Sequence, residues 1–210
     1  MTINLLSLNK IDSLAKANNA NLLIVTKNQT IDDITILVDM GFKLFGENRV
    51  QEAKKKYANL SKKDIELHLI GSLQTNKVKI ALKIFDYIQS IDKKPQIDLI
   101  SKIILQDGNN VKTKGFFLQV NIGNEPQKSG ISKSYINEFY EYSISKGLKI
   151  TGLMCIPPNV NDTSQYFNEM ISIKNKINNK LHLSMGMSND YEIALKHSSN
   201  LIRVGSAIFI

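Results

Sequence analysis

Strand-like and helix-like segments alternate along the whole of this 210-residue chain, and this alternation limits its fold more than any other feature. Eight short segments are rich in β-branched and aromatic residues and nearly continuous in apolar character, as buried parallel strands are. We expect these strands at residues 22–26, 42–46, 66–71, 87–91, 116–121, 150–156, 182–187 and 201–209. Helical patterns lie between them. In the first, Thr30 and Asp33 have the spacing of a capping box, and Gly41 stands where the helix would end.

A strand, a helix and a further strand form a parallel pair through a right-handed crossover. Eight such strands favour one closed (β/α)8 barrel, a TIM barrel. No linker or composition shift divides residues 1–210, so we expect a single domain. The last strand leaves no residues for an eighth outer helix. We therefore expect an N-terminal helix carrying Leu5, Leu8, Ile11 and Leu14 to cover that side of the barrel. The alternative is an open, doubly wound sheet.

Composition and charge narrow the classes of function. Hydrophobic residues make up 42% and charged residues 22%, as in a folded globular domain. The single cysteine, Cys155, excludes a disulfide scaffold. A lone thiol and an N-terminus that does not resemble a secretory signal together favour a cytoplasmic protein. No segment has the ~20 apolar residues that span a bilayer. The net charge of +8 is scattered, so we expect no nucleic-acid or membrane partner. The three histidines and one cysteine lack zinc-site spacing, so we expect no metal.

Polar residues at the carboxyl ends of the first strands are candidates, because TIM barrels carry their active sites there. Lys27 follows the first strand on the inward-facing phase, where partial desolvation would make its amine a nucleophile toward carbonyls. The alternative is a solvated lysine that begins a loop. Asn48 follows the second strand and either caps the next helix or donates into the barrel mouth. His68 faces inward in the third strand, as a pocket residue or as a hydrogen-bonded core residue.

The last two strands indicate an anion site. Arg203 lies on the inward phase, where a buried guanidinium needs an anion or another acceptor. Gly205 and Ser206, together with Ser188, offer backbone N–H groups and hydroxyls for a phosphate. The alternative is a solvent-facing turn beside a structurally paired arginine. A lysine nucleophile opposite a phosphate site suggests a Schiff base with a phosphorylated aldehyde, either pyridoxal 5′-phosphate (PLP) or a sugar phosphate.

Seven sequence blocks, in order between residues 22 and 209, carry a family resemblance: LLIVTK, FGENRVQE, HLIGSLQTNK, QVNIGNEPQKSG, GLMCIPP, LSMGMSND and IRVGSAIF. With them the chain resembles the YggS/PROSC family of PLP homeostasis proteins, which looks like the barrel domain of alanine racemase standing alone. The resemblance implies that Lys27 holds PLP as an internal aldimine and that Arg203 faces the pyridine nitrogen. It implies the remaining cofactor positions as well, with Ser188, Gly205 and Ser206 at the phosphate and Asn48 and His68 near the ring.

The chain departs from the family pattern at several positions. Thr26 stands where the family often has serine, and Gln29 replaces a second family lysine. Ser72 stands where proline is usual. Ser206 replaces a threonine but keeps the hydroxyl. A short tail usual after the last strand is also missing.

The resemblance implies a PLP-binding protein of vitamin B6 homeostasis, without an established reaction, whose partners are PLP and apo-enzymes that accept it. An arginine at the pyridine nitrogen keeps that nitrogen unprotonated and weakens the ring as an electron sink. A racemase also needs a second acid or base, which related racemases take from another domain and subunit, whereas this chain stops at Ile210. We therefore expect a monomeric PLP carrier. The alternatives are a weak PLP-dependent amino-acid racemase or lyase, and a barrel enzyme acting on a sugar phosphate.

Overall fold

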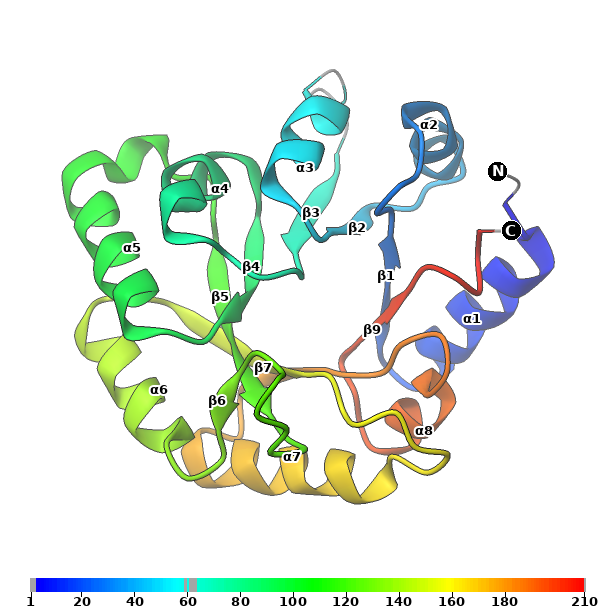
Figure 1. Ribbon diagram of the computed structural model, residues 1–210. Coiled ribbons are helices and arrows are strands. Elements are labelled where there is room, and N and C mark those ends of the chain that lie inside the picture. Colours follow the sequence, from blue (N-terminus) through cyan, green and yellow to red (C-terminus); the bar gives the residue numbers. More distant parts are fainter. Residues whose placement is uncertain (1–2, 59, 61–63, 210) are drawn as a thin grey trace.

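The computed structural model describes residues 3–58, 60 and 64–209 as a barrel of strands within a ring of helices (Figure 1). The strands are β1 (Asn21–Val25), β2 (Leu44–Glu47), β3 (Glu66–Leu69), β4 (Tyr87–Ile91), β5 (Gly115–Asn121), β6 (Ile131–Ser132), β7 (Ile150–Cys155), β8 (His182–Ser184) and β9 (Leu201–Val204). The α-helices are α1 (Leu5–Ala17), α2 (Ile31–Asp39), α3 (Val50–Tyr57), α4 (Val78–Ile84), α5 (Lys94–Asp107), α6 (Ile136–Ser145), α7 (Ser164–Ile177) and α8 (Tyr191–Lys196).

The sheet closes on itself through parallel pairs. β1 pairs with both β2 and β9, and β4 pairs with β5, which gives the ring β1-β2-β3-β4-β5-β7-β8-β9. β6 is a two-residue addition that pairs with the end of β5. Each of the eight predicted strands has its counterpart in this ring. The predicted TIM barrel is therefore confirmed, and the β4–β5 pairing rules out an open sheet.

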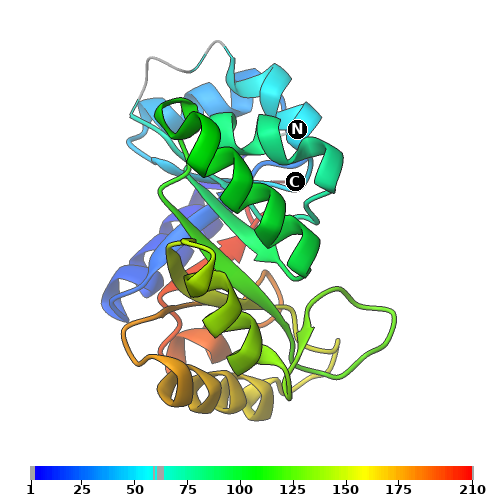
Figure 2. The same cartoon turned by 90° about the vertical axis from the view of Figure 1, so that its left-hand side faces the viewer.

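The N-terminal helix closes the side of the barrel, as predicted. Leu8, Ile11 and Ala15 of α1 are buried in the hydrophobic core. Just before the helix, Ile3 forms an antiparallel bridge with Phe209, so the described ends of the chain lie side by side (Figures 1 and 2). This contact ties α1 to the segment after β9, where an eighth outer helix would otherwise stand.

The two faces of the barrel strands differ in chemistry. Because side chains alternate along a strand, Leu22 and Ile202 face the outer helices, and their neighbours Leu23 and Arg203 face the interior. TIM-barrel interiors are usually filled by branched aliphatic side chains. Among the described residues, the interior also holds five buried polar side chains: His68, Gln89, Gln119, Ser184 and Arg203.

Local signals act as expected around α2. Thr30 and Asp33 form the capping box of α2, and Gly41 takes a φ of +93° after the helix ends. The sequence patterns did not predict β6 or α8, because two and six residues are too few to show a period. No helix among the described residues is long and apolar enough to cross a membrane.

Candidate functional site

A pocket of about 440 Å³ lies at the carboxyl ends of the barrel strands. Its volume is typical of pockets that bind small molecules. Six of the predicted site residues line it, contributed by four different strand ends: Lys27, Asn48, Ser188, Arg203, Gly205 and Ser206. The remaining wall comes mainly from the segment after β7, including Ile156, Pro157 and Thr163.

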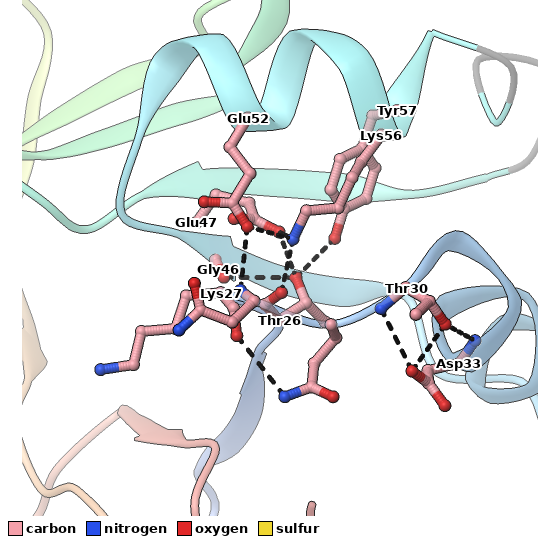
Figure 3. A network of polar contacts seen from close by, with 11 residues as sticks. Thr26, Lys27, Thr30, Asp33, Gly46, Glu47, Glu52, Lys56 and Tyr57 are labelled. Carbon is pink, nitrogen blue, oxygen red and sulfur yellow. Dashed lines mark hydrogen bonds and ion pairs between the residues drawn. The ribbon is translucent and has the colours of Figure 1, made fainter. Parts of the chain in front are cut away.

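Lys27 lies at the rim of the pocket. Its side chain extends away from the cluster of Glu47, Lys56 and Tyr57 behind it (Figure 3). The residue is exposed, so the expected partial desolvation of its amine is not found. The physical reason is position, because Lys27 stands two residues beyond the end of β1, past the paired part of the sheet.

Both neighbours of Lys27 are held through the backbone by the same cluster. The Lys56 ammonium donates to the Thr26 carbonyl at 2.6 Å. The Asn28 N–H donates to Glu52 Oε1 at 2.9 Å, and Asn28 takes a φ of +62°. Lys56 also pairs with Glu52 at 2.7 Å, so one ion pair joins the two backbone contacts (Figure 3).

A buried carboxylate forms the base of this cluster. Glu47 Oε1 accepts from the Thr26 hydroxyl at 2.7 Å and from Lys56 at 2.8 Å. Burial raises the pKa of Glu47, against the opposing effect of these two donors. The Tyr57 hydroxyl lies 2.8 Å from the Thr26 hydroxyl, and burial raises the pKa of Tyr57 as well. Sequence reasoning missed this cluster, although a glutamate that ends a buried strand was a signal for it.

Two buried oxygen atoms in the pocket lack a hydrogen-bond partner within the described structure. They are Asn48 Oδ1 and Thr163 Oγ1. Buried polar atoms are nearly always paired in folded proteins, so both atoms fit a site that receives a polar ligand. Gly71 packs directly on the backbone of Asn48, where a Cβ atom would lie only 2.2 Å from the Asn48 carbonyl oxygen.

On the opposite wall two hydroxyls meet. Ser206 Oγ donates to Ser188 Oγ at 3.0 Å. Asp190 shapes the loop that carries Ser188, since its carboxylate accepts from the Met187 N–H at 2.6 Å. Burial raises the pKa of Asp190, although the Met187 N–H and Arg203 favour its charged form. Gly205 approaches the first strand closely, and a Cβ there would lie 2.9 Å from the Val25 carbonyl oxygen.

Arg203 forms the floor of the pocket and is only 4% exposed. Its guanidinium donates to Ser184 Oγ at 2.9 Å and to the Cys155 carbonyl at 2.8 Å. Burial lowers its pKa. Among the described residues these acceptors are neutral and no carboxylate pairs with this guanidinium, which leaves a cationic group facing the pocket.

His68 is not among the residues that line this pocket. It lines a second cavity of about 390 Å³ at the amino ends of the strands, together with Glu66 and Tyr87. The residue that does reach the pocket from this segment is Ile70, two positions later. Two residues along a strand correspond to ~6.6 Å, so His68 lies one layer of side chains deeper in the barrel than Ile70. A residue beside the predicted cofactor ring would lie at the level of Ile70.

Lys128, from the QKSG block, reaches the edge of the pocket. Its ammonium donates to the carbonyl of Pro157, a lining residue, at 3.1 Å and pairs with Glu125 at 2.5 Å. Lys27 and Lys128 therefore both lie near the opening, and only Lys27 is a lining residue.

The fold and this pocket define a TIM barrel with a ligand-sized site at the carboxyl ends of its strands. The structure superposes on alanine racemase from Acinetobacter baumannii with a TM-score of 0.76 and 18% identity, over 96% of this chain and 59% of the racemase. At that identity the likeness concerns the fold alone. No family model matches the sequence.

Relatives at higher identity show the family. The chain is 36% identical over 201 residues to the pyridoxal phosphate homeostasis protein of Aquifex aeolicus, covering 91% of this chain and 87% of that protein. PipY of Synechococcus elongatus is 29% identical. Its structure without PLP has a TM-score of 0.86 over 97% of this chain and 98% of PipY, and its structure with PLP bound has one of 0.80 over 95% and 100%. The chain belongs to the family of pyridoxal phosphate homeostasis proteins.

Proposed function

We propose that the pocket at the barrel mouth binds PLP and that Lys27 holds it covalently. The observation that carries this proposal is that Lys27, Ser188, Arg203 and Ser206 line one pocket. The relatives are named for PLP homeostasis, and PipY has been solved with PLP bound.

The residues present suit the chemical groups of PLP. PLP supplies an aldehyde, which condenses with a lysine amine to form a Schiff base and release water. The Lys27 amine is exposed at the rim and available for that reaction. The paired hydroxyls of Ser188 and Ser206 offer hydrogen bonds to a phosphate. The unpartnered oxygen of Asn48 accepts a hydrogen bond from a ligand donor.

Arg203 would bind the ring nitrogen. An arginine stays protonated and acts only as a donor, so it contacts a ring nitrogen that is itself unprotonated. Such a ring withdraws electrons weakly and supports little carbanion chemistry. The exposed position of Lys27 also suits loading and release more than chemistry protected from water. We therefore propose that the protein holds PLP for homeostasis and transfers it to apo-enzymes, rather than catalysing an amino-acid reaction.

An absorption titration tests this proposal. PLP added to the protein should give a saturable visible band, and Lys27→Ala should lose it. Lys55→Ala, which removes an exposed lysine of α3, should keep the band. A colourless wild-type protein that does not bind PLP would reject the proposal. Conversion of an amino acid by wild type but not by Lys27→Ala would instead establish the racemase or lyase alternative.

A further inference from the structure

Four of the five buried polar side chains inside the barrel, Arg203, Ser184, Gln89 and His68, form one continuous chain of hydrogen bonds with Glu66. It begins at Arg203 beside the pocket and ends at Glu66 in the cavity at the other end of the barrel. We propose that Ser184 and Gln89 are positioning residues for Arg203, and that His68 and Glu66 set the direction of the chain that holds it. The consequence for a bound ring rests on the proposed function.

Each link has hydrogen-bonding distance. Arg203 donates to Ser184 Oγ at 2.9 Å, and Ser184 donates to Gln89 Oε1 at 2.7 Å. Gln89 Nε2 lies 2.7 Å from His68 Nδ1. His68 Nε2 lies 3.0 Å from Glu66 Oε1. Four strands contribute, since β9 carries Arg203, β8 Ser184, β4 Gln89, and β3 both His68 and Glu66.

The two ends force a single direction on the chain. A guanidinium only donates, so Ser184 must accept from Arg203 and use its one hydrogen toward Gln89. The Gln89 carbonyl then accepts, and its amide NH₂ donates to His68 Nδ1. Because Nδ1 accepts, the hydrogen that His68 donates is on Nε2, where it points at the Glu66 carboxylate. A donor therefore faces an acceptor at each of the four links.

Burial makes this order matter. Ser184 and Gln89 are fully buried, and His68 is 3% exposed. A buried polar group that loses its partner cannot form a hydrogen bond with water instead. Breaking one link therefore removes the constraint on the orientation of the next side chain. Arg203 has no carboxylate contact among the described residues, and its side chain is held instead by Ser184 and by the Cys155 carbonyl. Loss of Gln89 would leave Ser184 free to rotate, and the guanidinium would keep only the Cys155 carbonyl as a fixed acceptor.

The test uses Gln89→Leu, which removes a link that does not touch the pocket. Gln119→Leu is the matched control, because Gln119 is also a buried glutamine on the inner face and bonds the Ser129 carbonyl outside the chain. We expect Gln89→Leu to weaken PLP binding about tenfold and to shift the visible spectrum of the bound cofactor in the same direction as Ser184→Ala. Gln119→Leu should change neither. Equal effects of the two leucine variants would overturn the proposal.

A second readout needs no cofactor. In the unloaded protein, the denaturation midpoints of Gln89→Leu, Arg203→Leu and the double variant form a double-mutant cycle. We expect a non-additive result for this pair and an additive result for Gln119→Leu with Arg203→Leu. Additivity in both cycles would reject the chain even if PLP binds. A wild-type protein that fails to bind PLP but shows the coupling would reject the proposed function and leave the chain intact.

Discussion

The Lys56 ammonium donates a hydrogen bond of 2.6 Å to the main-chain carbonyl of Thr26, the residue directly before Lys27. The same ammonium pairs with the buried Glu47 at 2.8 Å. One cation therefore holds the backbone at the proposed PLP lysine and compensates a carboxylate with no exposed surface (Figure 3). The other carboxylate oxygen, Glu47 Oε2, has no hydrogen-bond partner within the described structure, so Lys56 is the cation on which this carboxylate depends.

Lys56→Met should destabilise the protein by about 3–5 kcal/mol, because it leaves the Glu47 carboxylate buried without its cation. Chemical denaturation measures this effect. Lys55→Met on the same helix removes an exposed ammonium and should change stability by less than about 0.5 kcal/mol. Equal stability of Lys56→Met and wild type would show that the cluster is not a structural requirement.

The same variant should affect covalent capture more than binding. With the Thr26 carbonyl released, Lys27 loses its fixed backbone, so the rate of adduct formation with PLP should fall. Pyridoxamine phosphate has no aldehyde and needs no lysine, so its affinity should change little. Fluorescence or absorption titrations of the two ligands separate these effects, and equal weakening of both would assign Lys56 to general folding alone.

The paired hydroxyls of Ser188 and Ser206 predict that the protein distinguishes PLP from a ligand without the phosphate. Ser188→Ala combined with Ser206→Ala should weaken PLP binding about hundredfold or more, since each of the two lost hydrogen bonds to a charged group is worth about 1.5–3 kcal/mol. Binding of pyridoxal, which lacks the phosphate, should be nearly unchanged. Ser172→Ala, on the outer face of α7, serves as the control. A parallel loss for pyridoxal and PLP would place the phosphate elsewhere.

Asp86 predicts a pH dependence of stability. Burial alone would raise its pKa, but hydrogen bonds from the Leu67 N–H and from Lys112 and Lys114 outweigh burial and hold the pKa below its ordinary 3.8. A depressed native pKa stabilises the fold above the unfolded pKa, and that contribution is lost as pH falls through the native pKa. Asp86→Asn should therefore be less stable than wild type at pH 7, and the difference should shrink on acidification below about pH 4. A difference that grows on acidification would contradict this assignment.

Cys155 should be unreactive in the folded protein. Burial raises the pKa of its thiol to about 12, although the nearby Arg203 favours the thiolate. Thiol reagents attack the thiolate, so labelling at pH 8 should be slow until denaturant exposes the residue. Stoichiometric labelling of the native protein within minutes would show that the hydrophobic core around Cys155 opens readily.

The sequence predicted the barrel well because its signals are local. Strand-sized apolar runs, the capping box at Thr30 and the stop at Gly41 act within a few residues of themselves. The residues Lys27, Asn48, Ser188 and Arg203 were predicted to lie together because parallel strands bring their carboxyl ends to one edge, and they do line one pocket. That rule also explains the shared pocket.

The depth of a residue inside the barrel was harder to predict. His68 was expected beside the ring, but register along the barrel axis depends on how neighbouring strands are staggered, which no single strand reveals. The partners of Glu47 lie on another element, so a glutamate ending a strand did not disclose its cation. The Gln89–Ser184 link joins residues 95 positions apart. Such contacts form only when the barrel closes, so no local pattern in the sequence indicates them.

Chemical trapping tests the central claim most directly. The protein is incubated with PLP, reduced with borohydride, digested and analysed by peptide mass spectrometry. The account predicts one stable phosphopyridoxyl adduct, on Lys27. An adduct on Lys128 or another lysine, or none after saturation with PLP, would contradict it.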